Sequence, residues 1–291
     1  MEEHQFEALG TLWRVSIDTS KIASSIWQEV EAEVELFDQR FSRFILNSEA
    51  NTWRTAKSGK YPVSPEFANL LDFAQTLRAK THDKFDPAIG GLLELSGYNR
   101  EYDFTPDISQ IKKWRVPHWN LTGLTLDVDG PVVFDVGGYG KGSCVDLVVQ
   151  LLQRKGFQYF LVDGGGDMYG SSKKDGSGWN VAVEWPGKPD EALTLVTLKN
   201  QALAASDILR RRWQEWHHLL DPLKRQPHQE VLSCATVSSR TQTADGLTTA
   251  LALTPPENRA TLASEYSVEY VMVTSDQKVH RSAGWPGQFW S

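Results

Sequence analysis

The sequence has little cysteine, no long apolar run and no excess of basic residues. Its two cysteines among 291 residues, Cys144 and Cys234, have neither metal-binding nor redox spacing, so we expect both to be reduced and buried. No apolar stretch approaches the roughly 20 residues that a membrane-spanning helix needs. The net charge of −7 argues against a nucleic-acid partner, which would favour a basic face.

The start of the chain also lacks a feature of exported proteins. Residues 1–7 are acidic and contain no apolar segment of the secretory type. We therefore expect a soluble, cytoplasmic protein, and a periplasmic location stays open if an export signal was removed. A hydrophobic content of 40% and a charged content of 23% are ordinary for a globular chain. Because no linker, low-complexity tract or clear repeat divides the sequence, we expect one domain over residues 1–291.

Apolar periodicity predicts both helices and strands. A half-buried strand is expected over residues 9–18, and apolar residues at steps of three and four predict a helix over residues 22–41. The segment Ser64-Pro65-Glu66 predicts the start of a second helix, because Ser caps helix N-termini and Pro suits the first helical position. Further helices are expected over residues 145–155, 243–253 and 256–266. Strands are expected over residues 159–162, 179–184, 193–198, 201–205, 216–220, 231–237, 269–274 and 277–281.

The order of these elements indicates the fold class. Strands gather in the second half of the chain and helices are interspersed between them, which favours an α+β fold over a regular βαβ array. Residues 44–54 are predicted to be a loop, and residues 97–120 show no period and are expected to be irregular. The 11 tryptophans are many for this length, and core packing is the default explanation for them.

A glycine-rich turn at residues 137–142 is the most distinctive feature. The apolar run Val132-Val133-Phe134 is predicted to be a strand that leads into Asp135-Val-Gly-Gly-Tyr-Gly-Lys-Gly142, ahead of the helix over residues 145–155. A strand, a glycine turn and a helix in this order offer free backbone N–H groups to an anion, so we predict that the turn holds the phosphates of a ligand. A second glycine turn, Asp163-Gly-Gly-Gly-Asp167, follows.

Neither turn matches a standard phosphate-binding motif. In the P-loop a Ser or Thr follows the lysine, whereas Gly142 follows Lys141. The dinucleotide-binding motif needs a third glycine, which is absent after Gly166. A tight connection without a ligand therefore remains the alternative for each turn. Two such turns beside acidic residues favour a ligand but do not identify it.

Two oxygen-bearing side chains suggest a metal. Asp245 and Thr249 are four residues apart on a predicted helix, so both face the same way. A carboxylate and a hydroxyl suit Mg²⁺, which commonly completes its coordination with substrate phosphates and water. The alternative is an acid that stabilises the helix N-terminus and a threonine with no role in binding, and spacing alone favours this alternative.

The pair His217-His218 is predicted to lie near the end of a strand. Adjacent strand residues point to opposite faces, so the two histidines cannot share one metal in simple geometry, and we expect one to be more buried than the other. A histidine near phosphate chemistry is a candidate general base because its pKa lies near neutrality. A hydrogen-bonded polar residue without catalytic role is the alternative. The basic run at residues 210–212 suits phosphates or an acidic partner, with a solvated loop as its alternative.

Seven short segments, taken in their order, span nearly the whole chain. They are Leu9-Gly-Thr11, Phe41-Ser-Arg-Phe44 with Ser48-Glu49, Phe85-Asp-Pro-Ala-Ile-Gly90, Asp135-Val-Gly-Gly-Tyr-Gly-Lys-Gly142 with Val145-Asp146, Leu161-Val-Asp-Gly-Gly-Gly-Asp167, His218-Leu-Leu-Asp-Pro222 and Ala244-Asp-Gly-Leu-Thr-Thr-Ala250. Together they resemble the FAD:protein FMN transferase family of ApbE type, and the specificity of the resemblance comes from the shared order, since no single segment is specific. The implied fold is a mixed α/β unit of the flavin-transferase, tunnelling-fold-like type with antiparallel sheets and packed helices.

The resemblance implies a flavin substrate and a metal. FAD would be the substrate, and Mg²⁺ would bind its diphosphate through Asp245, Thr249 and the carbonyl of Gly140. FMN would pass to a Ser or Thr hydroxyl of an acceptor protein with release of AMP; His218 would act as the general base and Lys141 would add positive charge at the phosphates. The implied FAD contacts are Thr11, Phe44, Phe85, Asp86, Gly137, Gly138, Lys141 and Asp163.

The chain also departs from the family pattern. Phe44 stands where the family usually has Tyr, and Trp53-Arg54 stands where many members have Leu-Asn. In the family that Asn position influences whether FAD is hydrolysed or only bound. Two alternatives to the transferase are therefore kept: a Mg²⁺-dependent pyrophosphatase that splits FAD into FMN and AMP, and a flavin-binding protein without catalytic activity.

Overall fold

The computed structural model describes residues 1–289, and its contacts group the chain into two compact units. Unit 1 contains Met1–Leu36, Tyr139–Arg210 and the described residues from Glu230 onward. Unit 2 contains Phe37–Gly138 and Arg211–Gln229. Both units are therefore built from segments that lie far apart in the sequence. This grouping by contacts does not test the expectation of one domain over residues 1–291, which stays a prediction.

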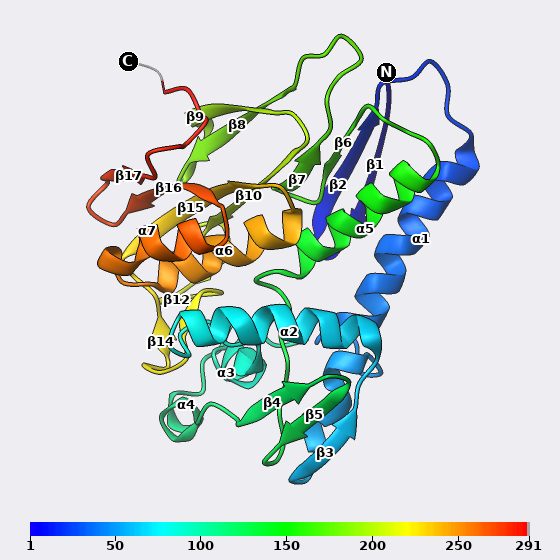
Figure 1. The fold of residues 1–291 in the computed structure, drawn as a ribbon. Helices are drawn as coiled ribbons and strands as arrows, with labels where there is room; N and C mark the ends of the chain where they lie inside the picture. The colour runs from blue at the N-terminus through cyan, green and yellow to red at the C-terminus, as the bar shows by residue number, and fades with distance from the viewer. Residues whose placement is uncertain (290–291) are drawn as a thin grey trace. The chain divides into compact units, whose positions relative to one another are not determined.

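Unit 1 is built on an antiparallel sheet of eight strands, in the order β1-β2-β6-β7-β10-β15-β16-β17 (Figure 1). Its strands are β1 (Glu2–Ala8), β2 (Thr11–Ile17), β6 (Phe160–Asp163), β7 (Asp167–Gly170), β10 (Gln201–Asp207), β15 (Val231–Ser238), β16 (Glu269–Thr274) and β17 (Val279–Arg281). Its helices are α1 (Ser24–Phe41), which continues into unit 2, α5 (Gly140–Arg154), α6 (Thr241–Leu253) and α7 (Pro256–Glu265). Antiparallel pairing and packed helices confirm the predicted α+β class.

Alternate residues of the central strands face two different layers. In β10, Ala204 packs against Ala244 of α6, whereas Leu203 belongs to a core cluster shared with the hairpin of β8 (Trp179–Trp185) and β9 (Lys188–Leu198). Successive side chains of a strand point to opposite faces, so the sheet has helices on one face and this hairpin on the other. Helices α5 and α6 lie side by side against the sheet (Figure 1).

Unit 2 combines helices with small antiparallel sheets. Its helical segments are the 3-10 helices η1 (Glu49–Thr55) and η2 (Pro87–Ile89) and the α-helices α2 (Pro65–Lys80), α3 (Gly90–Leu95) and α4 (Ile108–Lys113). Its strands are β3 (Gly59–Pro62), β4 (Trp119–Thr122) and β5 (Thr125–Val128) in one sheet, and the pairs β11 (Arg212–Trp213) with β12 (Trp216–His217) and β13 (Leu220–Asp221) with β14 (Gln226–Pro227). As predicted, Ser64 caps α2, because its hydroxyl oxygen accepts a hydrogen bond from Phe67 N at 3.1 Å.

Buried aromatic rings fill the centre of unit 2. Trp53 stacks on Phe67 with ring centroids 5.3 Å apart, and Trp119 meets Phe134 edge to face at 5.4 Å. All four side chains are buried. Core packing therefore explains these two tryptophans, as expected.

The strand predicted at residues 132–134 was wrong. Val132 N donates to the Trp53 carbonyl at 3.0 Å, and the Val133 carbonyl accepts from Gly90 N at 3.1 Å. The backbone of this segment is therefore satisfied by helices and loops of unit 2 and joins no sheet. Apolar composition predicted burial correctly but could not say which partners the backbone would find.

Other boundaries also differ from the predictions. Helix α5 begins at Gly140 rather than at residue 145, so two glycines of the glycine turn are helical. The stretch 97–120, predicted to be irregular, contains α4 and the first half of β4, and the strand predicted over residues 216–220 is divided between β12 and β13. The predicted loop over residues 44–54 contains most of η1. Apart from α5, each of these elements is short, so periodicity carries little signal for it.

The two cysteines behave as predicted. Cys144 and Cys234 are both free and buried, and burial raises the pKa of the Cys234 thiol to about 12. A thiol with so high a pKa is unreactive at neutral pH. Among residues 1–289 there is no helix whose length and apolar character would suit it to cross a bilayer.

Candidate functional site

The glycine turn and the Asp245 segment meet in unit 1, where α5 and α6 pack together. Gly142 N, in the first turn of α5, donates a hydrogen bond to Oδ2 of Asp245 in α6 at 2.9 Å, across 103 residues of sequence. A Cβ at position 142 would lie 2.7 Å from the Asp245 Cβ and nearer still to the Thr241 carbonyl oxygen. Only glycine permits this approach, so the two segments are matched to each other.

Asp245 and Thr249 share one face of α6, as their spacing predicted. Asp245 is buried and Thr249 is half-buried. Within the described residues, no group of three or more His, Cys, Asp or Glu side chains could hold a metal ion. A metal here would therefore depend on the mixed donor set of a carboxylate, a hydroxyl and the predicted carbonyl of Gly140, which begins α5.

Lys141 is paired with Asp167, whose side chain is buried. Asp167 ends the second glycine turn and begins β7, so this ion pair joins that turn to the first turn of α5. A buried carboxylate is tolerated when a partner of opposite charge meets it. The pair holds the Lys141 ammonium group against Asp167 at the start of β7.

Thr11 and Asp163 shape the second glycine turn. Asp163 Oδ1 accepts hydrogen bonds from Gly165 N and Gly166 N, both at 2.9 Å. Gly165 has a φ of 77°, and a Cβ there would collide with the side chain of Thr11. The structure therefore brings Thr11 and Asp163, two of the predicted FAD contacts, to the same turn. The Asp163 carboxylate also stabilises the backbone of that turn.

Phe85 and Asp86 are buried in unit 2. Asp86 Oδ1 accepts from Ala88 N at 2.8 Å, which caps η2, and from Trp119 Nε1 at 2.9 Å. Burial raises the pKa of Asp86 to about 6 against the opposing effect of these hydrogen bonds. Both residues thus have a structural role, and their contact with FAD stays a prediction.

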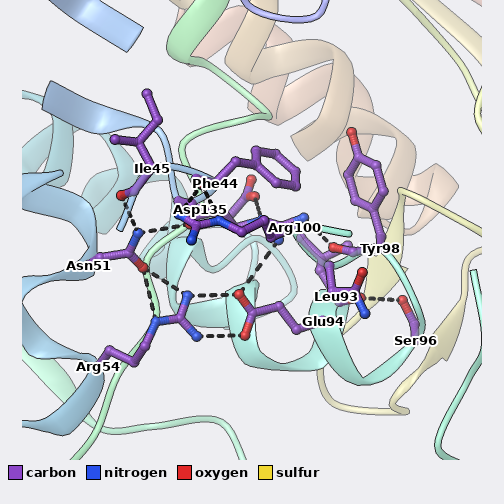
Figure 2. A network of polar contacts seen from close by, with 12 residues as sticks. Phe44, Ile45, Asn51, Arg54, Leu93, Glu94, Ser96, Tyr98, Arg100 and Asp135 are labelled. Carbon is purple, nitrogen blue, oxygen red and sulfur yellow. Dashed lines mark hydrogen bonds and ion pairs between the residues drawn. The ribbon is translucent and has the colours of Figure 1, made fainter. Parts of the chain in front are cut away.

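Asp135, at the start of the glycine turn, ends a chain of charged groups in unit 2 (Figure 2). Its Oδ2 pairs with Arg43 Nε, and Arg43 Nη1 lies 3.8 Å from Glu94 Oε1. Arg54 donates two bonds of 2.7 Å to the two carboxylate oxygens of Glu94, drawn as parallel dashes in Figure 2. Asp135 Oδ1 accepts from Gly137 N at 2.7 Å. The chain of contacts therefore runs from residue 54 to the predicted phosphate-binding turn.

Phe44 belongs to an aromatic cluster. Tyr102 stacks on it with ring centroids 5.2 Å apart and planes at 18°, and Tyr98 meets it edge to face at 5.6 Å. The Arg43 guanidinium lies 4.1 Å from the centre of the Phe44 ring, and Arg100 donates to the Phe44 carbonyl at 2.7 Å (Figure 2). Flat aromatic surfaces of this kind suit a ligand that stacks.

His217 and His218 differ in burial, as expected: His217 is buried and His218 is half-buried. His217 Nδ1 accepts from Leu219 N at 3.2 Å, so the proton lies on Nε2, which donates to the His228 carbonyl at 2.6 Å. Burial lowers the pKa of His217 to about 4, and its imidazole is therefore neutral at pH 7. The predicted base, His218, belongs to unit 2.

Three charged residues of these groups were not predicted as site residues. Asp146 accepts from Thr241 N at 2.8 Å, and Asp167 and Arg43 form the ion pairs described above. Asp146 had a signal in the sequence, since it lies four residues after Gly142 and thus on the same face of a helix that includes both. Arg43 had none, because its partner is 92 residues away.

Comparison with known proteins gives a family and named relatives. The chain matches the model of the ApbE family over residues 9–272. The FAD:protein FMN transferase of Klebsiella pneumoniae (strain 342) is 25% identical over 292 residues, which cover 93% of this chain and 83% of the relative. The FAD:protein FMN transferase of Haemophilus influenzae is 26% identical over 290 residues, which cover 92% and 82%.

Solved structures share the fold. The flavin transferase ApbE from Vibrio cholerae superposes with a TM-score of 0.85 at 23% identity and covers 98% of each chain. The ApbE protein from Thermotoga maritima superposes with a TM-score of 0.87 at 24% identity and covers 97% of each chain. This likeness confirms the mixed α/β architecture with antiparallel sheets and packed helices.

Proposed function

The chain belongs to the ApbE family, and from this membership we propose that it is an FAD:protein FMN transferase. It would move FMN from FAD to a Ser or Thr hydroxyl of an acceptor protein, with Mg²⁺ bound and AMP released. The Gly142–Asp245 hydrogen bond carries the proposal, because it joins the glycine turn to the helix that bears both predicted Mg²⁺ side-chain ligands. The names of the relatives agree with this activity.

The residues present fit Mg²⁺. The Asp245 carboxylate and the Thr249 hydroxyl are hard oxygen donors on one face of α6, and the Gly140 carbonyl would be a third. Mg²⁺ takes few protein ligands when substrate phosphates and water complete its coordination. When bound, it would neutralise the negative charge that develops on the diphosphate of FAD.

The chain's own groups would position the phosphates and move the proton. Lys141, held by Asp167, would supply positive charge to the diphosphate. His218 would take the proton of the acceptor hydroxyl while its oxygen bonds to the phosphorus of the FMN moiety. The bond from that phosphorus to the bridging oxygen would break, and AMP would leave with that oxygen.

The aromatic cluster around Phe44 would bind the flavin ring. Phe44 and Tyr102 lie nearly parallel, and the exposed fraction of Tyr102 is 46%, so its ring offers surface to a flat ligand. Stacked aromatic rings contribute about 0.5–1.5 kcal/mol beyond the area that they bury. Phenylalanine at position 44 retains this contribution even though the family usually has tyrosine there.

An acceptor assay tests the proposal. The purified chain is incubated with FAD, Mg²⁺ and an acceptor protein that carries a Ser/Thr flavinylation motif, and the acceptor is followed by in-gel flavin fluorescence while AMP and FMN are followed by chromatography. We expect a fluorescent acceptor and one AMP per label. An acceptor whose target hydroxyl is changed to alanine is the matched control and should stay dark.

The same assay separates the alternatives. Release of AMP and free FMN without labelling would indicate the pyrophosphatase. A chain that binds FAD, which flavin fluorescence reports, but releases neither product would indicate a non-catalytic flavin-binding protein. Either outcome would contradict the transferase assignment.

A further inference from the structure

Helices α5 and α6 both begin without a cap from their own sequence. Neither Tyr139, which precedes α5, nor Arg240, which precedes α6, makes a side-chain capping bond. The first N–H groups of a helix have no partner within that helix, and burying them unpaired is unfavourable. Gly142, Thr241 and Gln242 are all buried in these first turns, so their N–H groups depend on partners from elsewhere.

Each helix is instead capped by a carboxylate of the other. Asp146 of α5 accepts from Thr241 N at 2.8 Å and from Gln242 N at 3.2 Å in α6. Asp245 of α6 accepts from Gly142 N at 2.9 Å in α5. Each helix therefore donates an N–H group from its first turn and, one turn later, provides the carboxylate that accepts from the other helix. The arrangement is reciprocal. The helix dipole also favours negative charge at both places.

We propose that Asp146 is a positioning residue for Asp245. By binding the first turn of α6, Asp146 sets where α6 meets α5 and so holds the Asp245 carboxylate against Gly142 N. The inference rests on the proposed function, because it bears on FMN transfer only if Asp245 is a metal ligand. Arg240 Nε lies 3.4 Å from Asp146 Oδ2, but its side chain is mostly exposed and contributes little.

The close approach at Gly142 makes this coupling tight. A Cβ there would be 2.7 Å from the Asp245 Cβ, so the two helices are in close contact at Gly142 and leave no room for a methyl group between them. A tilt or shift of α6, once Asp146 no longer binds Thr241 and Gln242, therefore displaces Asp245 directly. Residues that orient metal ligands in this way change metal affinity by about 10–100-fold when they are removed.

Amide hydrogen exchange tests the coupling without any metal. In Asp146→Ala of the full chain, the peptide that contains Gly142 should exchange at least about tenfold faster than in the wild type, because Asp245 no longer holds that N–H. Asp146→Asn keeps one acceptor oxygen and should be intermediate. Ser171→Ala is the matched control: its hydroxyl also accepts from a buried backbone group, Phe160 N at 2.6 Å, but it donates to the carbonyls of Phe160 and Ser172 rather than to the first turns of α5 and α6. This variant should leave exchange at Gly142 unchanged.

Binding of Mn²⁺, followed by electron paramagnetic resonance with FAD present, tests the consequence. We expect the Mn²⁺ dissociation constant to rise at least about tenfold in Asp146→Ala, to rise less in Asp146→Asn, and to stay at the wild-type value in Ser171→Ala. Asp146→Asn also keeps the test decisive if Asp146→Ala does not fold.

The outcomes separate this inference from the proposed function. Unchanged exchange at Gly142 in both Asp146 variants would overturn the inference, as would faster exchange with unchanged Mn²⁺ affinity. A wild-type chain that binds no Mn²⁺ would contradict the metal site of the proposed function, and the exchange measurement alone would then decide whether Asp146 holds Asp245.

Discussion

At the scale of single residues, His217 should make stability depend on pH. Burial lowers its pKa from 6.5 to about 4. Between these values the unfolded chain binds a proton that the folded chain does not, so the free energy of unfolding falls as pH falls through this window, by up to about 3 kcal/mol. Above pH 6.5 both states are neutral and His217 has no effect on the slope.

Urea unfolding at pH 7 and pH 5 measures this effect. His217→Gln removes the titrating group, so the difference in stability between the two pH values should shrink relative to the wild type. An equal difference in both proteins would show that His217 is not buried as a neutral imidazole.

Asp86 should act with the opposite sign. Burial raises its pKa from 3.8 to about 6, so between these values the folded chain binds a proton that the unfolded chain lacks. The contribution of Asp86 is fully present below pH 3.8 and is lost as pH rises through 6, by up to about 3 kcal/mol. Asp86→Asn keeps an acceptor for Ala88 N and Trp119 Nε1 without titrating. The free energy of unfolding of Asp86→Asn should therefore rise relative to that of the wild type between pH 4 and pH 7. A difference that stays constant over this range would contradict the raised pKa.

At the scale of elements, Gly142 sets the distance between α5 and α6. In Gly142→Ala the new methyl group would lie 2.7 Å from the Asp245 Cβ, so the helices must separate and the chain should lose about 1–3 kcal/mol of stability. Gly130→Ala is the control, because a Cβ there meets no atom within 4 Å. Chemical unfolding should place the control within about 0.5 kcal/mol of the wild type. Equal stability of the two variants would mean that the helices do not meet closely at Gly142.

The ion pair between Arg54 and Glu94 should be coupled more strongly than an ordinary surface pair. Its two parallel bonds and its partly buried side chains, 33% and 24% exposed, favour a coupling energy of about 1 kcal/mol or more in a double-mutant cycle with alanine. The exposed pair Lys188–Glu191 is the control and should give less than about 0.5 kcal/mol. A coupling energy as small as that of the control would show that Arg54 and Glu94 interact no more strongly than an exposed ion pair.

At the scale of the whole molecule, transfer should need both the predicted metal ligand and the predicted base. Asp245→Asn in unit 1 should lose Mg²⁺-dependent transfer, because a neutral amide is a poor ligand for Mg²⁺. His218→Gln in unit 2 should still bind FAD and lose transfer by at least about 100-fold, because no base accepts the hydroxyl proton. Flavin fluorescence reports binding and acceptor labelling reports transfer. Normal labelling by either variant would remove that residue from its proposed role.

Local pattern was enough for the long helices and not for the short elements. Helix α2 was predicted from Ser64 onward, because the capping residue, the proline and the apolar period agree. Helices such as α4 and two-residue strands such as β14 escaped prediction, because so few residues carry no recognisable period. The early start of α5 was also missed, because glycine disfavours a helix interior and its tolerance here comes from packing against α6.

By itself, the sequence determined the α+β class and the resemblance to the ApbE family, because composition, periodicity and the order of short motifs are properties of the chain alone. It also placed Asp245 and Thr249 on one helix face, since that follows from the helical repeat. Only the tertiary structure decided which distant groups meet: Asp245 with Gly142, and Lys141 with Asp167. Such contacts depend on how helices and strands pack, and a residue's partner many positions away leaves no trace in local periodicity.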